Sequence, residues 1–369
     1  MRVCHICSNY DAFFTDLMNF QILNGIDLKV FYFRAKERGM PNIKDPYVDV
    51  RLNYKNWHRL FFRFKENLVL RDFIKLYNKG EFDLIHAHTL FSNGYIALQV
   101  KKRWGIPYIV AVRDVDLNIF LKYRFTLRKI GRDILRESEK IVFLSPKYKE
   151  QMFEKYVPAK YFNEFHAKSI ILPNGINSFF HENKYEQIRK INVNEPLRIL
   201  TVGYVSKRKN QLAVCKAIEV LNRRGIEANY TVIGKVLDRR LLEKLKSYPF
   251  VRYIPFMSKN DLLEEYRRAH MLVMPSVRET FGLVYAEAMS QGLPVIYTKG
   301  QGFDGQFKEG LVGYSVDCQD YEEIASKIEM VVDNYDKITV NCINEVQRFD
   351  WDAVSKRYIE LYEKILQKM

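Results

Sequence analysis

The stretch that most constrains the fold runs from Met271 to Pro294, MLVMPSVRETFGLVYAEAMSQGLP. It opens with a short apolar run that is typical of a buried parallel strand, and a Pro-Ser pair then ends that run. After Phe281 and Gly282, apolar and small residues recur at helical spacing until Gly292. This order of strand, turn and helix predicts an anion site, because the first backbone N–H groups of a helix have no internal partner.

Two carboxylates bracket this predicted site, Glu279 in the turn and Glu287 inside the helix. An acid beside an anion site needs another task, and accepting hydrogen bonds from hydroxyl groups, such as those of a sugar, is one. The alternative is a turn carboxylate followed by a capped helix, with no ligand involved.

Strand-like apolar runs alternate with helical patterns along both halves of the chain, which predicts an α/β protein with two doubly wound, Rossmann-like domains. We expect an N-terminal domain over residues 1–180, a C-terminal domain over 181–350, and a last helix over 351–369 that packs back on the N-terminal domain, with the two domains facing each other across a cleft. Residues 37–55 and 300–313 are predicted as loops, and 181–196 as the linker. The expected strands are Val3–Cys7, Leu28–Phe33, Phe82–Ala87, Tyr108–Val112, Ile141–Leu144, Ile170–Leu172, Arg198–Val202, Asn229–Ile233, Val251–Ile254, Met271–Met274 and Pro294–Tyr297.

Composition narrows the classes of protein that the chain can belong to. No run reaches the roughly 18 apolar residues of a membrane span, and the first residues lack the apolar core of a signal peptide, so we expect a cytoplasmic protein. Cys4 and Cys7 form a CxxC pair, but they lie three apart on a predicted strand and point to opposite faces. We therefore expect no metal site and no redox role.

The net charge of +15 lies mostly in the N-terminal half, where residues 1–180 hold 30 Lys and Arg against 18 Asp and Glu. Within that half, the predicted helical segment Trp57–Tyr77 mixes aromatic and basic residues. Such a segment can lie on anionic lipid, or it can be a core-facing helix with a solvated basic face. No nucleic-acid recognition motif accompanies the charge, so we expect no nucleic-acid partner.

A second phosphate-binding turn is predicted at the start of the C-terminal domain. Gly203 follows a predicted strand, and the cations Lys207, Arg208 and Lys209 come just before a predicted helix. Cations beside a helix N-terminus suit a phosphate group, although a solvated basic turn has the same sequence.

Together these motifs resemble the signature of the GT4 family of retaining glycosyltransferases, which use nucleotide-sugar donors and have the GT-B fold. The resemblance is carried by Glu279-x7-Glu287 with its flanking prolines and glycines, by the Leu-Pro-Asn-Gly sequence that ends at Gly175, and by Lys209. It extends over essentially the whole chain but is weak before Phe82. The family has an arginine at the position of Tyr204, and Lys207 or Arg208 could replace it.

The resemblance implies roles for individual residues. Lys209 would hold the donor diphosphate, Glu279 the donor-sugar hydroxyls and Glu287 the ribose hydroxyls, while a segment around Phe256 would line the nucleobase. The residues expected to bind the donor are Gly203, Lys207, Arg208, Lys209, Phe256, Glu279, Phe281, Gly282, Leu283 and Glu287. Those expected to meet the acceptor are Asn9, Asp114 and Asn174. The expected catalytic set is Lys209, Glu279, His88 and Arg113.

Two strand ends in the N-terminal half supply further candidates. His86 and His88 match a His-x-His pattern of the family; we expect His86 in the core and His88 in the cleft. Arg113 stands where many members have a histidine, and it could clamp a donor or acceptor phosphate or form an ion pair with Asp114. Asp114 and Asp116 have the spacing of a metal-binding Asp-x-Asp motif, which we interpret as accidental.

The resemblance therefore implies a metal-independent, retaining hexosyltransferase without a cofactor. A UDP-sugar is the expected donor, and a glycan or lipid-linked acceptor of surface-polysaccharide synthesis the expected acceptor, with peripheral association at the inner face of the membrane. Same-face attack is preferred because no isolated carboxylate stands out as a nucleophile. The alternative is a catalytically inactive protein that binds a nucleotide sugar. An oxidoreductase is disfavoured, since no G-x-G-x-x-G follows the strand that ends at Val202.

Overall fold

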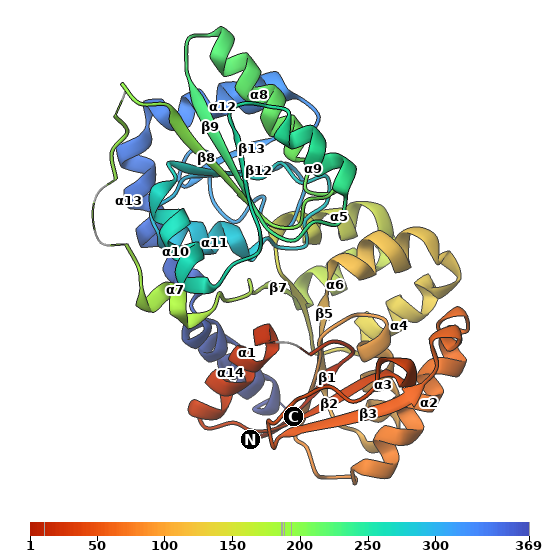
Figure 1. Ribbon diagram of the computed structural model, residues 1–369. Helices are drawn as coiled ribbons and strands as arrows, with labels where there is room; N and C mark the ends of the chain where they lie inside the picture. Colours follow the sequence, from red (N-terminus) through yellow and green to blue (C-terminus); the bar gives the residue numbers. More distant parts are fainter. Residues whose placement is uncertain (11, 186, 188, 193, 369) are drawn as a thin grey trace. The chain divides into compact units, whose positions relative to one another are not determined.

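The computed structural model describes residues 1–10, 12–185, 187, 189–192 and 194–368 (Figure 1). Parts of the predicted linker, at 186, 188 and 193, and the last residue of the chain lie outside the described residues. The chain forms two compact units. The N-terminal unit comprises Met1–Leu144, Tyr148–Pro173 and Trp351–Met369, and the C-terminal unit comprises Ser145–Lys147 and Asn174–Asp350. The change of unit thus falls at residue 173, before the predicted boundary at 180.

The N-terminal unit is built on a seven-stranded sheet in the order β3-β2-β1-β4-β5-β6-β7, in which every neighbouring pair is parallel. Alternate residues of β1 enter two separate cores: Cys4 and Ile6 one, Val3 and Cys7 the other. The two cysteines of the CxxC pair therefore point to opposite faces, as predicted. The strands are β1 (Arg2–Cys7), β2 (Asp27–Ala35), β3 (Val48–Tyr54), β4 (Leu84–Ala87), β5 (Tyr108–Val112), β6 (Lys140–Phe143) and β7 (Ser169–Ile171).

Helices lie against both of these cores. One core is covered by α1 and α14, the second of which brings Trp351 and Tyr362 from the end of the chain into the N-terminal unit. The other core takes up aromatic residues of α2 such as Phe73. The helices of the unit are α1 (Ala12–Leu23), α2 (Phe62–Leu76), α3 (Ser92–Trp104), α4 (Arg128–Glu137), α5 (Pro146–Tyr156), α6 (Phe162–Lys168) and α14 (Trp351–Leu366).

Two predictions for the N-terminal half were wrong. Residues 37–55 are not all loop, because 48–54 form the edge strand β3, which pairs with β2. The sequence pattern over Leu121–Glu137 also predicts a single helix, basic on one side, but a π-helix covers Asp116–Leu121 and α4 begins only at Arg128. The π-helix follows the end of β5, where the Asp116 carboxylate accepts a hydrogen bond from the backbone N–H of Arg113.

The C-terminal unit contains a six-stranded parallel sheet in the order β10-β9-β8-β11-β12-β13. Its strands are β8 (Leu197–Val202), β9 (Ala228–Ile233), β10 (Val251–Ile254), β11 (Met271–Val273), β12 (Val295–Thr298) and β13 (Gly313–Val316). Its helices are α7 (Ser178–Glu182), α8 (Gln211–Arg223), α9 (Arg239–Lys246), α10 (Lys259–Arg268), α11 (Leu283–Ser290), α12 (Tyr321–Asp333) and α13 (Tyr335–Glu345).

The edge strand β13 was not predicted, because it is short and begins at a glycine. In both sheets the strand order reverses near the centre, between β1 and β4 and between β8 and β11. Ligands of doubly wound sheets bind at such points, beyond the carboxyl ends of the strands. No helix of the described residues is both long and apolar enough to span a bilayer.

Candidate functional site

The loops that follow β8 and β11 meet at the point where the order of the C-terminal sheet reverses. Lys209 Nζ lies 2.5 Å from Glu279 Oε2, and both side chains are more than nine-tenths buried. The two loops are also tied by their backbones, since Val277 N donates to the Arg208 carbonyl at 2.9 Å. Two residues that lie 70 apart in the sequence thus form one buried ion pair at the expected anion site.

The position of the Lys209 side chain depends on the backbone at two residues, Gly203 before it and Asn210 directly after it. Gly203 has a φ of 153°, and a Cβ added there would lie 3.1 Å from Lys209 Cε, so a larger residue would displace the lysine stem. Asn210 follows the lysine in a left-handed conformation with a φ of 57°, which asparagine tolerates better than most residues. Its side-chain amide donates to the carbonyls of Pro275 and Cys318, at 3.1 and 2.6 Å. The turn is therefore fixed before any ligand arrives.

Glu279 is held in place by the loop that follows β12. Its backbone N–H donates to Gln301 Oε1 at 2.9 Å, and its carbonyl accepts from the Gly302 N–H at 3.1 Å. The Ser276 hydroxyl donates to the carboxylate at 3.4 Å. Gln301 and Gly302 lie in the segment 300–313 that was predicted as a loop, and the cluster of glycines there is a signal of close backbone approach.

The start of α11 is shaped by Gly282, which has a φ of 78°. A Cβ there would lie 2.4 Å from the ring of Tyr285, so this turn requires glycine. Phe281 is 2% exposed, and its ring lies against those of Phe303 and Phe349. The Phe281 side chain therefore packs in the core, and only its backbone is placed to meet a ligand. Its backbone and those of Gly282 and Leu283 still lie at the helix N-terminus.

Glu287 lies within α11 and faces Tyr266, whose hydroxyl donates to Oε2 at 3.1 Å. Burial raises the pKa of Glu287 to about 7, and the hydrogen bond from Tyr266 and the charge of Lys259 act against that rise. The carboxylate is therefore close to its titration point near neutral pH.

The remaining donor-side candidates lie at the surface of the C-terminal unit. Lys207, Arg208 and Phe256 are exposed, and Lys235 Nζ lies 4.9 Å from the centre of the Phe256 ring. Asn174, which was expected to meet the acceptor, is half-buried.

The expected position of His88 in a cleft was wrong. His88 is 1% exposed, its Nε2 lies 2.9 Å from His5 Nδ1, and its ring stacks on His86 at 4.0 Å between centroids. His86 Nδ1 in turn lies 2.7 Å from the Tyr362 hydroxyl. Burial lowers the pKa of all three histidines, so the cluster is neutral and belongs to the core. His86 and His88 share a face because they lie two apart on one strand and its extension.

The loop after β5 is braced by Asp116. Its carboxylate accepts from the backbone N–H groups of Leu90, Phe91 and Arg113 at 2.9 to 3.3 Å. Burial raises the pKa of Asp116 to about 6 despite these bonds. An acid engaged in this way supports the loop.

Arg113 and Asp114 make separate contacts in the N-terminal unit. Arg113 Nε donates to the His88 carbonyl at 3.2 Å, and burial lowers the pKa of its guanidinium. Asp114 Oδ1 accepts from Asn118 at 2.7 Å and from Tyr148 at 3.4 Å. Asn9 is exposed at the end of β1.

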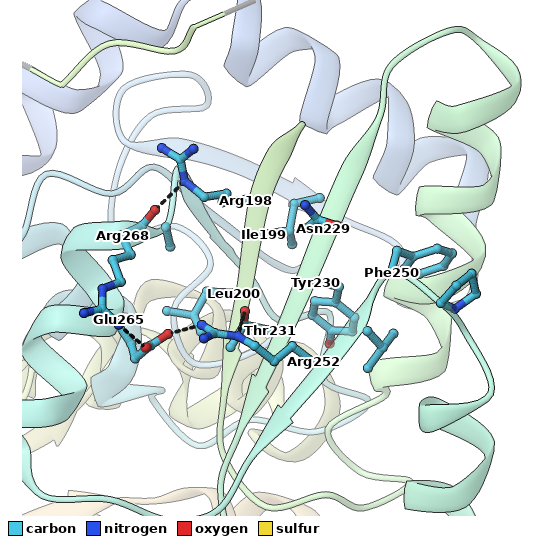
Figure 2. A pocket seen from close by; sticks show the side chains of 13 residues that line it. Arg198, Ile199, Leu200, Asn229, Tyr230, Thr231, Phe250, Arg252, Glu265 and Arg268 are labelled. Carbon is cyan, nitrogen blue, oxygen red and sulfur yellow. Dashed lines mark hydrogen bonds and ion pairs between the residues drawn. The ribbon is translucent and has the colours of Figure 1, made fainter. Parts of the chain in front are cut away.

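The C-terminal unit also has a cavity of about 530 Å³ (Figure 2), and neither Lys209 nor Glu279 is among the described residues that line it. It is lined in part by the amino-terminal half of β8, and each of its charged side chains has a hydrogen-bond partner within the lining. Glu265 binds both Arg252 and Arg268, and Arg198 Nε donates to the Arg268 carbonyl at 2.7 Å. Because ligands of such sheets bind at the carboxyl ends of the strands, this cavity is not the donor site.

Comparison with known proteins identifies the family. Residues 183–349 match the model of "Glycosyl transferases group 1", and residues 21–161 match that of the "Glycosyl transferase 4-like domain". The chain belongs to this family of glycosyltransferases. Similar relatives include the D-inositol 3-phosphate glycosyltransferase of Thermobispora bispora, 24% identical over 80% of this chain and 73% of the relative. The alpha-monoglucosyldiacylglycerol synthase of Acholeplasma laidlawii is 24% identical over 68% of this chain and 67% of the relative.

Solved structures of glycosyltransferases share the fold. Sucrose-phosphate synthase of Thermosynechococcus elongatus has a TM-score of 0.77 at 18% identity, with both chains covered completely. The lipopolysaccharide outer core galactosyltransferase WaaB has a TM-score of 0.74 at 16% identity, again over both whole chains. Anabaena HepE in complex with UDP and glucose has a TM-score of 0.69 at 16% identity, over 99% of this chain and all of HepE. The glycosyltransferase thus has two Rossmann-like domains of the GT-B type.

Proposed function

We propose that this glycosyltransferase transfers a hexose from a UDP-sugar, with retention and without a metal ion, to a glycan or lipid-linked acceptor of surface-polysaccharide synthesis. The observation that carries the proposal is the buried pair of Lys209 and Glu279 at the reversal point of the C-terminal sheet. A cation and a hydroxyl acceptor side by side suit a molecule that joins a diphosphate to a sugar.

The chemistry follows from the charge that develops during transfer. Breaking the anomeric bond leaves negative charge on the departing diphosphate and positive character on the sugar. Lys209 and the N–H groups at the start of α11 would stabilise the diphosphate by preorganised electrostatics. Glu279 would orient the sugar through its hydroxyls. The acceptor then attacks on the same face, and the leaving phosphate takes its proton, so no base is needed from the protein.

Several findings support the choice of substrates. The similar structure of HepE holds UDP and glucose, which favours a UDP-sugar. Relatives are named for an inositol phosphate and for a glucosyldiacylglycerol, which favours polar and lipid-linked acceptors over a protein.

Donor choice can be tested by thermal unfolding. We expect a UDP-sugar to raise the melting temperature, whereas GDP- and ADP-sugars leave it unchanged. At a ligand concentration 100 times Kd the folded state gains about 2.7 kcal/mol, which corresponds to a shift of several degrees. If no UDP-sugar raises the melting temperature and another nucleotide sugar does, the assignment of the donor is wrong.

Association with an anionic membrane is a further part of the proposal, supported by the excess of 12 positive charges in residues 1–180 and by the basic residues of α2. We expect the protein to float with liposomes that contain phosphatidylglycerol and to remain at the bottom of the gradient with neutral liposomes. Binding should weaken as salt rises from 50 to 500 mM, because screening acts on exposed charges. Equal binding to both kinds of liposome would exclude the electrostatic contribution.

A further inference from the structure

A second cavity, of about 310 Å³, lies in the N-terminal unit where the order of its sheet reverses. Asn9, just after β1, and Ser92, at the start of α3, both line it. It therefore lies at the ligand-binding edge of a doubly wound sheet and beside the N-terminus of a helix of 13 residues.

Four cations line this cavity, namely Arg38, Arg59, Lys65 and Arg124, and none of the described residues that line it carries a carboxylate. Lys65 is 7% exposed. Its Nζ lies 2.8 Å from Glu66 Oε1 and 3.2 Å from Ser92 Oγ. Because Glu66 pairs with Lys65, the positive charges of Arg38, Arg59 and Arg124 remain around the cavity. A buried, oriented ammonium with arginines at the rim suits an oxyanion.

The two arginines at the rim are held by neutral groups. Arg59 Nη2 donates to the Tyr54 hydroxyl at 3.4 Å, and Arg124 Nη2 donates to the Arg59 carbonyl at 3.2 Å. Neither Arg59 nor Arg124 forms an ion pair with another of the described residues. Their charge is therefore available to a ligand.

A cluster of exposed apolar side chains adjoins the rim. We call Trp57, Leu60, Phe61 and Phe64 the apolar lip; their exposed fractions are 54, 72, 58 and 50%. The ring centre of Trp57 lies 6.3 Å from that of Phe61 and 6.4 Å from that of Phe64. The lip is attached to the cavity, because Arg124 donates to the carbonyls of both Arg59 and Leu60. A contiguous exposed apolar cluster marks a binding surface more often than scattered side chains do.

We propose that this cavity binds the phosphoryl group of an amphiphilic acceptor while the apolar lip holds the acceptor's hydrocarbon chain. The inference rests on the proposed function, in that it names the class of acceptor for the same reaction. A soluble sugar phosphate would use the cations but has no group for the lip. A neutral glycolipid would use the lip but leave the charges without a counterion.

Trp57 provides a direct probe of this proposal. Of the three tryptophans, Trp351 is buried and Trp104 is half-buried, whereas Trp57 lies in the lip. We would titrate the full chain with dihexanoylphosphatidic acid, with dihexanoylphosphatidylcholine and with inorganic phosphate. Phosphatidic acid should shift the tryptophan emission to shorter wavelength, and the shift should be absent from Trp57→Phe. Phosphatidylcholine has the same chains, but its trimethylammonium group offsets the charge of its phosphate, so it should bind at least tenfold more weakly. Inorganic phosphate should bind without a shift.

The arginines can be tested with a matched pair of double variants. Arg59→Gln with Arg124→Gln should weaken binding of phosphatidic acid by about tenfold or more, because each lost charged hydrogen bond is worth about one power of ten. Arg71→Gln with Arg103→Gln removes two exposed arginines that line a different cavity of the same unit and should leave binding unchanged. Melting temperatures of both double variants would show that each one folds.

The outcomes separate this inference from the proposed function. Equal affinity for the two lipids, an emission shift with inorganic phosphate alone, or equal binding by the two double variants would overturn it. The response of the melting temperature to a UDP-sugar depends on the C-terminal unit and should be the same in both double variants. Loss of the UDP-sugar response in the unaltered protein would instead refute the proposed function.

Discussion

Replacing Lys209 with methionine is expected to slow sugar transfer by about 10²-fold or more. The loss is of the size seen when a single preorganised donor to a developing negative charge is removed. The effect should appear in kcat, since the diphosphate carries its additional charge only as the anomeric bond breaks. The measurement is steady-state transfer, or hydrolysis of the nucleotide sugar where the acceptor is not in hand.

The same substitution should also lower stability, and this effect must be separated from the first. Lys209 and Glu279 are buried together, with side chains 8 and 9% exposed. Removing one partner of a buried ion pair leaves the other charge uncompensated and typically costs about 3–5 kcal/mol. A kinetic loss in Lys209→Met alone could therefore reflect partial unfolding.

The double variant Lys209→Met with Glu279→Gln resolves this ambiguity. With both charges removed, most of the stability should return, while transfer should remain slow because the diphosphate still lacks its cation. Recovery of both stability and turnover in the double variant would contradict the role of Lys209. Normal turnover in Lys209→Met would do the same. A protein that binds a UDP-sugar but hydrolyses none, even without substitution, would support the inactive alternative.

Much of this site could be predicted from the sequence, because its parts are local. The turn before Lys209 and the strand, turn and helix around Gly282 are each encoded within about 20 residues of sequence. Their meeting followed from the topology, since the loops of adjacent central strands emerge at the same edge of a parallel sheet. The ion pair itself was not predicted. Lys209 and Glu279 were assigned to different parts of the donor, and nothing local shows that two side chains 70 residues apart will touch.

The errors in the prediction have different physical causes. Residues 48–54 alternate polar and apolar side chains as an edge strand should, but they follow a proline-bearing polar stretch that masked the pattern. His88 was misplaced because the end of a strand does not determine whether the next side chain points to solvent. That depends on what packs above it, here His5 from β1 and Phe14 from α1. The cavity around Lys65 was missed because its four cations come from segments that are separate in the sequence.

Glu287 should make both stability and donor binding depend on pH near neutrality. Burial raises the pKa of its carboxyl from an ordinary value of 4.5 to about 7 in the folded protein. The folded state therefore holds this proton more tightly than the unfolded state. The resulting stabilisation is complete below about pH 4.5 and is lost as pH rises to about 7, up to about 3 kcal/mol in all.

The substitution Glu287→Gln removes this titration. The free energy of unfolding of Glu287→Gln, relative to the unaltered protein, should rise between pH 5 and 8 and then become constant. Chemical denaturation at a series of pH values measures this difference. Tyr266→Phe provides an independent check: its hydroxyl lowers the pKa of Glu287, so its removal should move the window to higher pH.

Donor binding should respond in the opposite direction to stability. A carboxylate accepts hydrogen bonds from two ribose hydroxyls, whereas a protonated carboxyl must use one oxygen as a donor. Affinity for the UDP-sugar should therefore increase as pH rises through about 7 in the unaltered protein, and Glu287→Gln should bind weakly at every pH. A stability difference that stays constant from pH 5 to 8 would show that Glu287 does not titrate there. A pH-dependent stability difference without a matching change in affinity would place Glu287 outside the donor site, because the same proton is linked to both equilibria.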